Sequence, residues 1–279
     1  MACAVFAISD VMSKLLSTTM PIVEIQWIRY VLFLAMAVVL AARSGDRPLR
    51  PRNPKLQVLR GLCVTGSSVL FVYGLRQMTM AQATTISFLS PLLITVLSIP
   101  LLGEVVGIRR WGAVIVGMIG MLIVVRPGTE GFQPAALFGV ASSGCWALVL
   151  IITRRISGSD APRTTLLWSA MIGVVLLTIL LPFDAVWPEG WQLGLCLMLG
   201  VLSSIGQWLV VMAHRLAPAS LLAPISYTQL PWVTLGGYFV FSNLPDQWTL
   251  VGASVIIASG LYTAHRERAR ARLAVDSVA

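Results

Sequence analysis

The stretch from Gly74 to Pro91, GLRQMTMAQATTISFLSP, has a shorter counterpart in the second half of the chain, Ser220 to Pro231, SLLAPISYTQLP. The two stretches share a proline and, one residue out of step, an Ile-Ser-aromatic triplet. Glycine and proline set backbone geometry, so their coincidence indicates two copies of one folding unit, residues 59–126 and 199–266. The matched pairs are Pro91 with Pro231, Phe88 with Tyr227, Gly66 with Gly206, Ala83 with Ala223, Gly112 with Gly252 and Gly120 with Gly260.

Hydrophobic segments around both copies predict ten membrane-spanning helices. Spans of about 20 residues would use about 200 of the 279 residues, which leaves little for a soluble domain. Turn residues such as the Pro127-Gly128 pair separate the segments. We expect helices near residues 2–18, 24–42, 57–75, 82–102, 109–125, 134–153, 165–182, 191–213, 219–241 and 247–264.

Each copy lies in a half with five predicted spans, and an odd number of spans forces the second half to lie upside down relative to the first. The predicted fold is therefore an all-α integral membrane protein, with ten transmembrane helices arranged as two inverted five-helix repeats. The first repeat would cover residues 1–126 and the second residues 132–265, followed by a basic cytoplasmic tail over residues 266–279.

The chain is 57% hydrophobic and 11% charged, which is far less charged than a soluble domain, and its net charge is +9. Lys and Arg gather in the even-numbered loops and the tail, and this distribution predicts a membrane orientation with both termini in the cytoplasm. Because the charge lies in short loops and a tail, we expect no nucleic-acid partner. The cysteines fall inside predicted spans without the spacing of metal ligands, so we expect no metal and no other cofactor. They are Cys3, Cys63, Cys145 and Cys196.

Several segments together resemble the EamA-type repeat, which defines bacterial members of the drug/metabolite transporter superfamily. The Gly-Glu pair at 103–104 departs from strict symmetry, because Ser242-Asn243 stands after the ninth helix, and the first helix is short at its start. The residues that carry the resemblance are Gly74–Pro91, Leu101–Glu104, Gly112–Gly120 and Ser220–Pro231, with Lys14 and the Trp27-Ile28-Arg29-Tyr30 sequence.

The resemblance implies a central cavity lined by helices 1, 3, 4, 6, 8 and 9. Helices 5 and 10 would pack at the periphery, where they support homodimers in some members. Members of the family export amino acids, nucleotide-like metabolites or drugs, and this chain is similar to the subgroup that exports aromatic amino acids. The resemblance also implies a multi-pass protein of the bacterial plasma (inner) membrane.

Transport needs a polar site near the midplane that does not face lipid. Hydroxyl and amide groups can hydrogen-bond the amino and carboxylate groups of a solute, and aromatic rings can stack on it. Close helix packing for serine and an interfacial position for tryptophan remain alternatives. The expected substrate-binding residues are Ser67, Tyr73, Ser87, Ser90, Ser143, Trp146, Ser204, Gln207, Trp208, Tyr227 and Gln229.

Two prolines and two charged residues have other expected roles. Pro91 and Pro231 lie inside predicted helices and are expected to act as hinges, with simple kinked packing as the alternative. Asp10 lies one helical turn before Lys14, so it is either a proton-coupling carboxylate or the partner of Lys14 in a local ion pair. Arg29 is expected at the outer membrane interface.

The predicted function is a secondary transporter that exports small metabolites, amino acids and aromatic ones among them, by alternating access through the central cavity. Its partners would be the solute and the lipid bilayer. A multidrug or S-adenosylmethionine-like metabolite carrier is the alternative, and a cationic solute would need Asp10. A passive channel or a structural membrane protein is the alternative from another class. Catalysis is not expected, because the sequence holds no His-Glu-x-x-His helix. Direct nucleotide-driven pumping is not expected either, because the sequence holds no Walker-type loop.

Overall fold

The computed structural model describes residues 2–42, 50–103, 107–129, 132–183, 186, 188–216 and 225–276, and every regular element within these ranges is helical. The helices are α1 (Ala2–Ser17), α2 (Ile22–Ala42), α3 (Pro54–Gln77), α4 (Met80–Ser87), α5 (Ser90–Leu102), α6 (Ile108–Val125), α7 (Ala136–Ile156), α8 (Pro162–Leu180), the 3-10 turn η1 (Leu181–Phe183), α9 (Gly190–Leu216), α11 (Gln229–Phe241) and α12 (Gln247–Asp276).

Six segments of the described chain are long and apolar enough to cross a membrane, and the Trp111–Val125 part of α6 is a shorter apolar helix. The six lie in α2, α3, the α4–α5 pair, α7, α8 and α9. These helices satisfy their own backbone hydrogen bonds, as a chain in hydrocarbon must. The protein is therefore a multi-pass membrane protein. The backbone of α12 continues through much of the predicted tail, to Asp276.

The predicted helix over 82–102 is two helices. α4 ends at Ser87, Phe88 and Leu89 form a turn, and α5 begins at Ser90 with Pro91 in its first turn. α11 likewise begins at Gln229, just before Pro231. Both prolines lie within helices, as expected, but in the first turn of each helix rather than in its middle. A proline fits the first turn, where its missing N–H would have had no helical partner, and its ring prevents the preceding helix from continuing.

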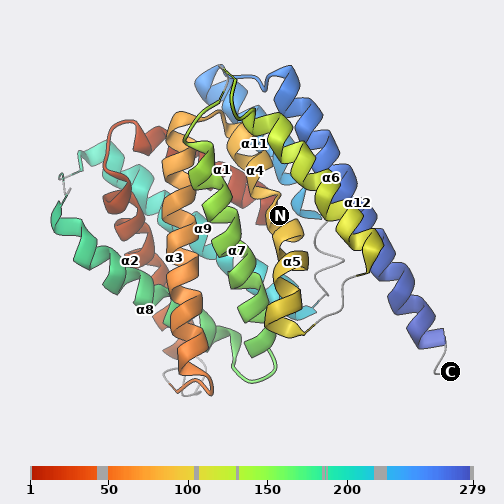
Figure 1. Ribbon diagram of the computed structural model, residues 1–279. Helices are drawn as coiled ribbons and strands as arrows, with labels where there is room; N and C mark the ends of the chain where they lie inside the picture. Colours follow the sequence, from red (N-terminus) through yellow and green to blue (C-terminus); the bar gives the residue numbers. More distant parts are fainter. Residues whose placement is uncertain are drawn as a thin grey trace.

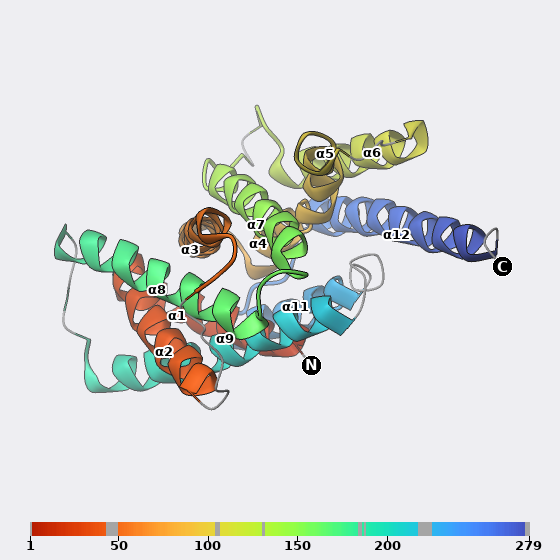
Figure 2. The ribbon, with the colours of Figure 1, turned by 90° about the horizontal axis from the view of Figure 1, so that it is seen from below.

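The helices pack in pairs that join the two halves of the chain. α3 packs against α7 and α8, α9 packs against α1 and α2, and α2 also packs against α8. α6 and α12 lie side by side at one edge of the bundle (Figures 1 and 2). Their close approach requires glycine, because a Cβ on Gly252 would lie 2.6 Å from the carbonyl oxygen of Gly120.

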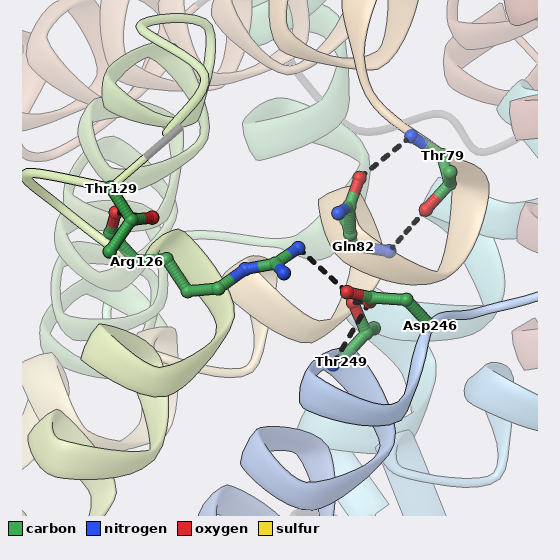
Figure 3. Close-up of polar contacts among 6 residues, drawn as sticks. All are labelled: Thr79, Gln82, Arg126, Thr129, Asp246 and Thr249. Carbon is green, nitrogen blue, oxygen red and sulfur yellow. Dashed lines mark hydrogen bonds and ion pairs between the residues drawn. The ribbon is translucent and has the colours of Figure 1, made fainter. Parts of the chain in front are cut away.

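Polar contacts tie the loops together at the two ends of the molecule. At the end that we call the Arg126 end, Arg126 donates to Asp246 at 2.6 Å, and Asp246 caps α12 through Thr249 (Figure 3). At the Asp160 end, the Asp160 carboxylate accepts from the backbone N–H of Arg52 at 2.8 Å. These contacts connect segments that are far apart in the sequence.

Candidate functional site

The central feature of the molecule is a cavity of about 350 Å³ between the helix breaks and the Asp160 end. Residues of α1, α2, α3, α4, α5, α7, α9, α11 and α12 line it. It extends along α5, whose last turn lies near the Asp160 end, because the Leu101 carbonyl oxygen accepts from Arg155 at 3.5 Å. Its polar lining, apart from two charged residues, is Ser67, Ser68, Thr84, Ser87, Ser90, Thr95, Ser142, Ser143, Gln207, Ser226, Gln229 and Thr263.

Asp10 and Arg29 bring opposite charges to the wall of this cavity. Gln229 Nε2 donates to Asp10 Oδ2 at 3.0 Å, and the positive charge of Arg29 acts on the same carboxylate. Arg29 is oriented by two acceptors on its Nη1, the Ser68 hydroxyl at 3.0 Å and Gln26 Oε1 at 3.3 Å. One acidic and one basic group are therefore available to a solute within the same space.

The expected pairing of Asp10 with Lys14 was wrong. Lys14 points away from the cavity, donates to the Met78 carbonyl oxygen at 2.5 Å and lies 5.1 Å from the centroid of the Phe241 ring. Arg29 was also misplaced by sequence reasoning, because it faces the cavity and not the outer interface. Its signal was its position inside an apolar span, where a charged side chain must find a polar partner or a wet space.

Aromatic side chains form much of the remaining lining. Phe6, Phe71, Phe88 and Trp146 come from α1, α3, the break between α4 and α5, and α7. Flat rings of this kind favour stacked or edge-to-face contact with another aromatic ring. The cavity therefore combines a charged pair, neutral hydrogen-bonding groups and aromatic surface.

Most of the predicted binding residues reach the cavity. The serines among them also hydrogen-bond helix backbone: Ser143, for example, donates to the Ile86 carbonyl oxygen at 3.0 Å, beside the break after α4. Packing and cavity lining are therefore compatible roles for one hydroxyl. The predicted residues on the wall are Asp10, Ser67, Ser87, Ser90, Pro91, Ser143, Trp146, Gln207 and Gln229.

Five predicted residues do not line the cavity. Tyr73 packs on Phe138 with 5.8 Å between ring centroids, and Trp208 packs against an apolar cluster around α2, α3, α7 and α8. Ser204 donates to the Gly200 carbonyl oxygen at 2.6 Å and borders a separate void of about 10 Å³. Pro231 is exposed. The fifth, Tyr227, lies behind the wall.

Tyr227 packs edge to face on Phe88, with 5.0 Å between ring centroids and 89° between ring planes. Its side chain is 6% exposed, and its hydroxyl has no hydrogen-bond partner among the described residues. The ring fits beside α12 because residue 260 is glycine: a Cβ there would lie 1.6 Å from the hydroxyl oxygen. The two helix breaks therefore meet at the base of the cavity through this aromatic pair.

Metal binding has no support in the part of the chain that the structure describes, which holds no cluster of three or more potential ligands among His, Cys, Asp and Glu.

Two ranges of the chain, residues 1–126 and 133–263, match the model of the EamA-like transporter family. Proteins named S-adenosylmethionine uptake transporter are similar to it: the one from Rickettsia felis is 29% identical over 93% of this chain and 88% of its own, and the one from Rickettsia bellii is 30% identical over 93% and 89%. A protein from Rhizobium johnstonii named riboflavin transporter is 28% identical over 82% and 76%.

A crystal structure of another protein superposes with a TM-score of 0.67 and covers 94% of this chain and 96% of its own. Its sequence is 19% identical to this one, so the likeness concerns the fold alone.

Proposed function

Since this chain belongs to the EamA-like transporter family and is a membrane transporter rather than an enzyme, we propose that it carries a small zwitterionic metabolite with an aromatic ring. S-adenosylmethionine is the first candidate. The observation that carries this proposal is the placement of Asp10 and Arg29 on one cavity wall whose other surfaces include Phe6, Phe71 and Trp146.

The chemistry of the cavity complements such a solute. The Asp10 carboxylate can accept from an ammonium group or face a sulfonium, and the Arg29 guanidinium can donate two hydrogen bonds to a carboxylate. Gln26 and Ser68 hold Arg29 in place, so less freedom is lost when a solute binds. An adenine ring could stack on Trp146 or Phe71.

The named relatives support this choice among solutes. S-adenosylmethionine carries the amino-acid head group, the sulfonium and the heteroaromatic ring that the cavity would recognise. Riboflavin has the ring but not the zwitterionic head group, so it uses less of this site. Aromatic amino acids have both a head group and a ring, so they are the second candidate, supported by the same charged pair and by Trp146. We still predict that the direction of transport is export, on the basis of the family resemblance, although the S-adenosylmethionine relatives are named for uptake.

The proposed architecture is two inverted five-helix repeats, residues 1–126 and 132–265, that work by alternating access. The family model matches the two halves separately. Helix breaks precede Pro91 in one half and Pro231 in the other. Interrupted helices at corresponding positions of two repeats are the usual position of a transporter binding site.

A pair of reciprocal hydrogen bonds also supports the repeat. Asp160, just before α8, accepts from the backbone N–H of Arg52, just before α3, at 2.8 Å. Glu24, in the first turn of α2, accepts from the backbone N–H of Val186, in the segment before α9, at 3.0 Å. Since α2 and α8 would be counterparts, as would α3 and α9, each half binds the other through the same kind of contact.

The test is uptake of labelled solutes into proteoliposomes that contain the purified protein. The panel comprises S-adenosylmethionine, tryptophan, phenylalanine and riboflavin. We expect saturable flux of S-adenosylmethionine, accelerated by unlabelled solute on the opposite side, because a carrier exchanges solutes through one site. Flux that does not saturate would indicate a channel.

The variant Asp10→Asn keeps the size of the side chain and removes its charge. It should abolish the flux of S-adenosylmethionine and reduce riboflavin flux far less. Glu189→Gln is the matched control, because Glu189 is exposed and lies outside the cavity. If Asp10→Asn transports S-adenosylmethionine like the control, the charged pair does not select the solute and the proposal fails.

A further inference from the structure

Phe88 and Tyr227 are counterpart residues that occupy unlike environments. In the sequence they end the matched Ile-Ser-aromatic triplets, and in the structure each lies at a helix break. Phe88 lines the cavity, whereas Tyr227 does not. The same position of the repeat therefore lines the cavity in the first copy and is excluded from it in the second.

The buried position of Tyr227 is unfavourable for its hydroxyl in the conformation described here. It is buried and has no hydrogen-bond partner among the described residues, while the ring of Phe88 has no polar group to satisfy. A buried polar group without a partner loses its hydrogen bonds to water and gains none in return. Tyr227 would gain partners if it faced the polar cavity.

We propose that Phe88 and Tyr227 exchange places during transport, so that Tyr227 lines the cavity and Phe88 packs behind it when the protein opens toward the Arg126 end. This inference rests on the proposed alternating access between inverted repeats. When two such repeats exchange conformations, the environment of each residue passes to its counterpart. The solute would then meet an apolar ring in one state and a hydroxyl in the other.

The structure also offers a way to hold the present state. Val11 follows the cavity residue Asp10 in α1, and Gly236 lies in α11 between the cavity residue Gln229 and the segment that leads to Asp246. A Cβ on Gly236 would lie 3.9 Å from the Cβ of Val11. That separation suits a disulfide. The double variant Val11→Cys and Gly236→Cys, in a background where the natural cysteines are alanine, should form a bond that ties α1 to α11 and stops flux until it is reduced.

The experiment adds Tyr227→Cys or, as the matched control, Phe88→Cys to this double variant. Proteoliposomes are treated with a membrane-impermeant maleimide, with and without prior reduction, and modification at each position is measured by peptide mass spectrometry. Disulfide formation itself reports that a variant has folded, because it needs α1 and α11 in contact. We expect Phe88→Cys to react while the disulfide is intact. Tyr227→Cys should react at least about tenfold faster after reduction.

Equal modification of Tyr227→Cys before and after reduction would overturn the exchange, and so would a lack of modification in both conditions while Phe88→Cys reacts. Labelling needs no solute, so a failed solute panel would refute the proposed substrate without affecting this result. Flux that continues with the disulfide intact would instead refute alternating access.

Discussion

Gln229 donates a hydrogen bond of 3.0 Å to Asp10, and this contact links the first helix of the chain to the helix that follows the second break. It holds Asp10 on the cavity wall, so Asp10 does not form the ion pair with Lys14 that their spacing suggested. Arg29 acts on the same carboxylate from α2. Asp10 and Arg29 come from the first two helices and Gln229 from the second half of the chain, and all three side chains line one cavity.

Replacing Arg29 should weaken solute binding. Arg29→Gln removes the positive charge that would face the solute carboxylate, so we expect the KM of S-adenosylmethionine flux to rise about 10- to 100-fold, the range of a lost charge-assisted hydrogen bond. Arg29→Lys should recover only part of the loss, because an ammonium lacks the fork of the guanidinium. Arg76→Gln, at an exposed position outside the cavity, is the control. An unchanged KM in Arg29→Gln would show that the solute does not contact this residue.

Asp10 is also the residue that we expect to couple transport to protons. If it does, a pH difference across the membrane should drive solute accumulation in the wild-type protein. The variant Asp10→Asn should then exchange neutral solutes at equal concentrations but accumulate none. Accumulation is measured with and without a proton ionophore. If the ionophore does not change accumulation by the wild-type protein, Asp10 has no role in proton coupling and acts in solute binding alone.

Gly260→Ala should destabilise the protein. Its new Cβ would overlap the Tyr227 hydroxyl and ring, at 1.6 and 2.5 Å, and overpacking of this kind costs roughly 1–3 kcal/mol. Gly144→Ala is the matched helical control, because nothing lies within 4 Å of its added Cβ, and it should be neutral or slightly stabilising. Thermal unfolding in detergent measures both. Adding Tyr227→Ala to Gly260→Ala should restore part of the lost Tm, and no recovery would mean that the clash lies elsewhere.

Asp246 should make stability depend on pH. Burial alone would raise the pKa of its carboxyl, but the hydrogen bonds from Thr249 and the charge of Arg126 outweigh it and hold the pKa below the ordinary value. A lowered folded-state pKa means that the stabilisation is present above the unfolded-state pKa and is lost as pH falls through the folded-state value. The side chains of Arg126 and Asp246 are 25% and 38% exposed, so the effect should stay within about 1 kcal/mol.

The measurement is the difference in Tm between wild type and Asp246→Asn as a function of pH. We expect the wild type to be the more stable protein at neutral pH and the difference to shrink in acid. A difference that is constant down to strongly acidic pH would show that the loss comes from geometry and not from the charge.

The orientation of the chain can be tested at two exposed positions. The distribution of Lys and Arg predicts that the Asp160 end faces the cytoplasm. In a background without natural cysteines, Thr129→Cys at the Arg126 end should react with an impermeant maleimide added to whole cells, and Ser157→Cys near the Asp160 end should react only after permeabilisation. The reverse pattern would place the Asp160 end on the outer side.

The membrane-spanning helical character of the chain could be predicted from the sequence, because it depends on local properties. Apolar runs such as Ile22–Leu40 must cross the bilayer as helices, since hydrocarbon offers no partner for a free backbone group. The family could also be predicted, because Pro91 and the glycines around it fix backbone geometry wherever the chain folds. An amide side chain without hydrogen-bond partners is unfavourable in lipid, so Gln207 and Gln229 are expected at a cavity, and both line it.

The tertiary structure decided which neighbours each side chain meets. Asp10 and Lys14 lie one turn apart on α1, yet Asp10 meets Gln229 and Lys14 meets the Met78 carbonyl oxygen. Those partners come from other helices, so spacing along one helix cannot specify them. Arg29 faces the cavity because α2 packs against α8 and α9. Tyr227 lies behind Phe88 because two breaks meet at the centre, and contact between distant segments depends on how the helices assemble, which no local pattern encodes.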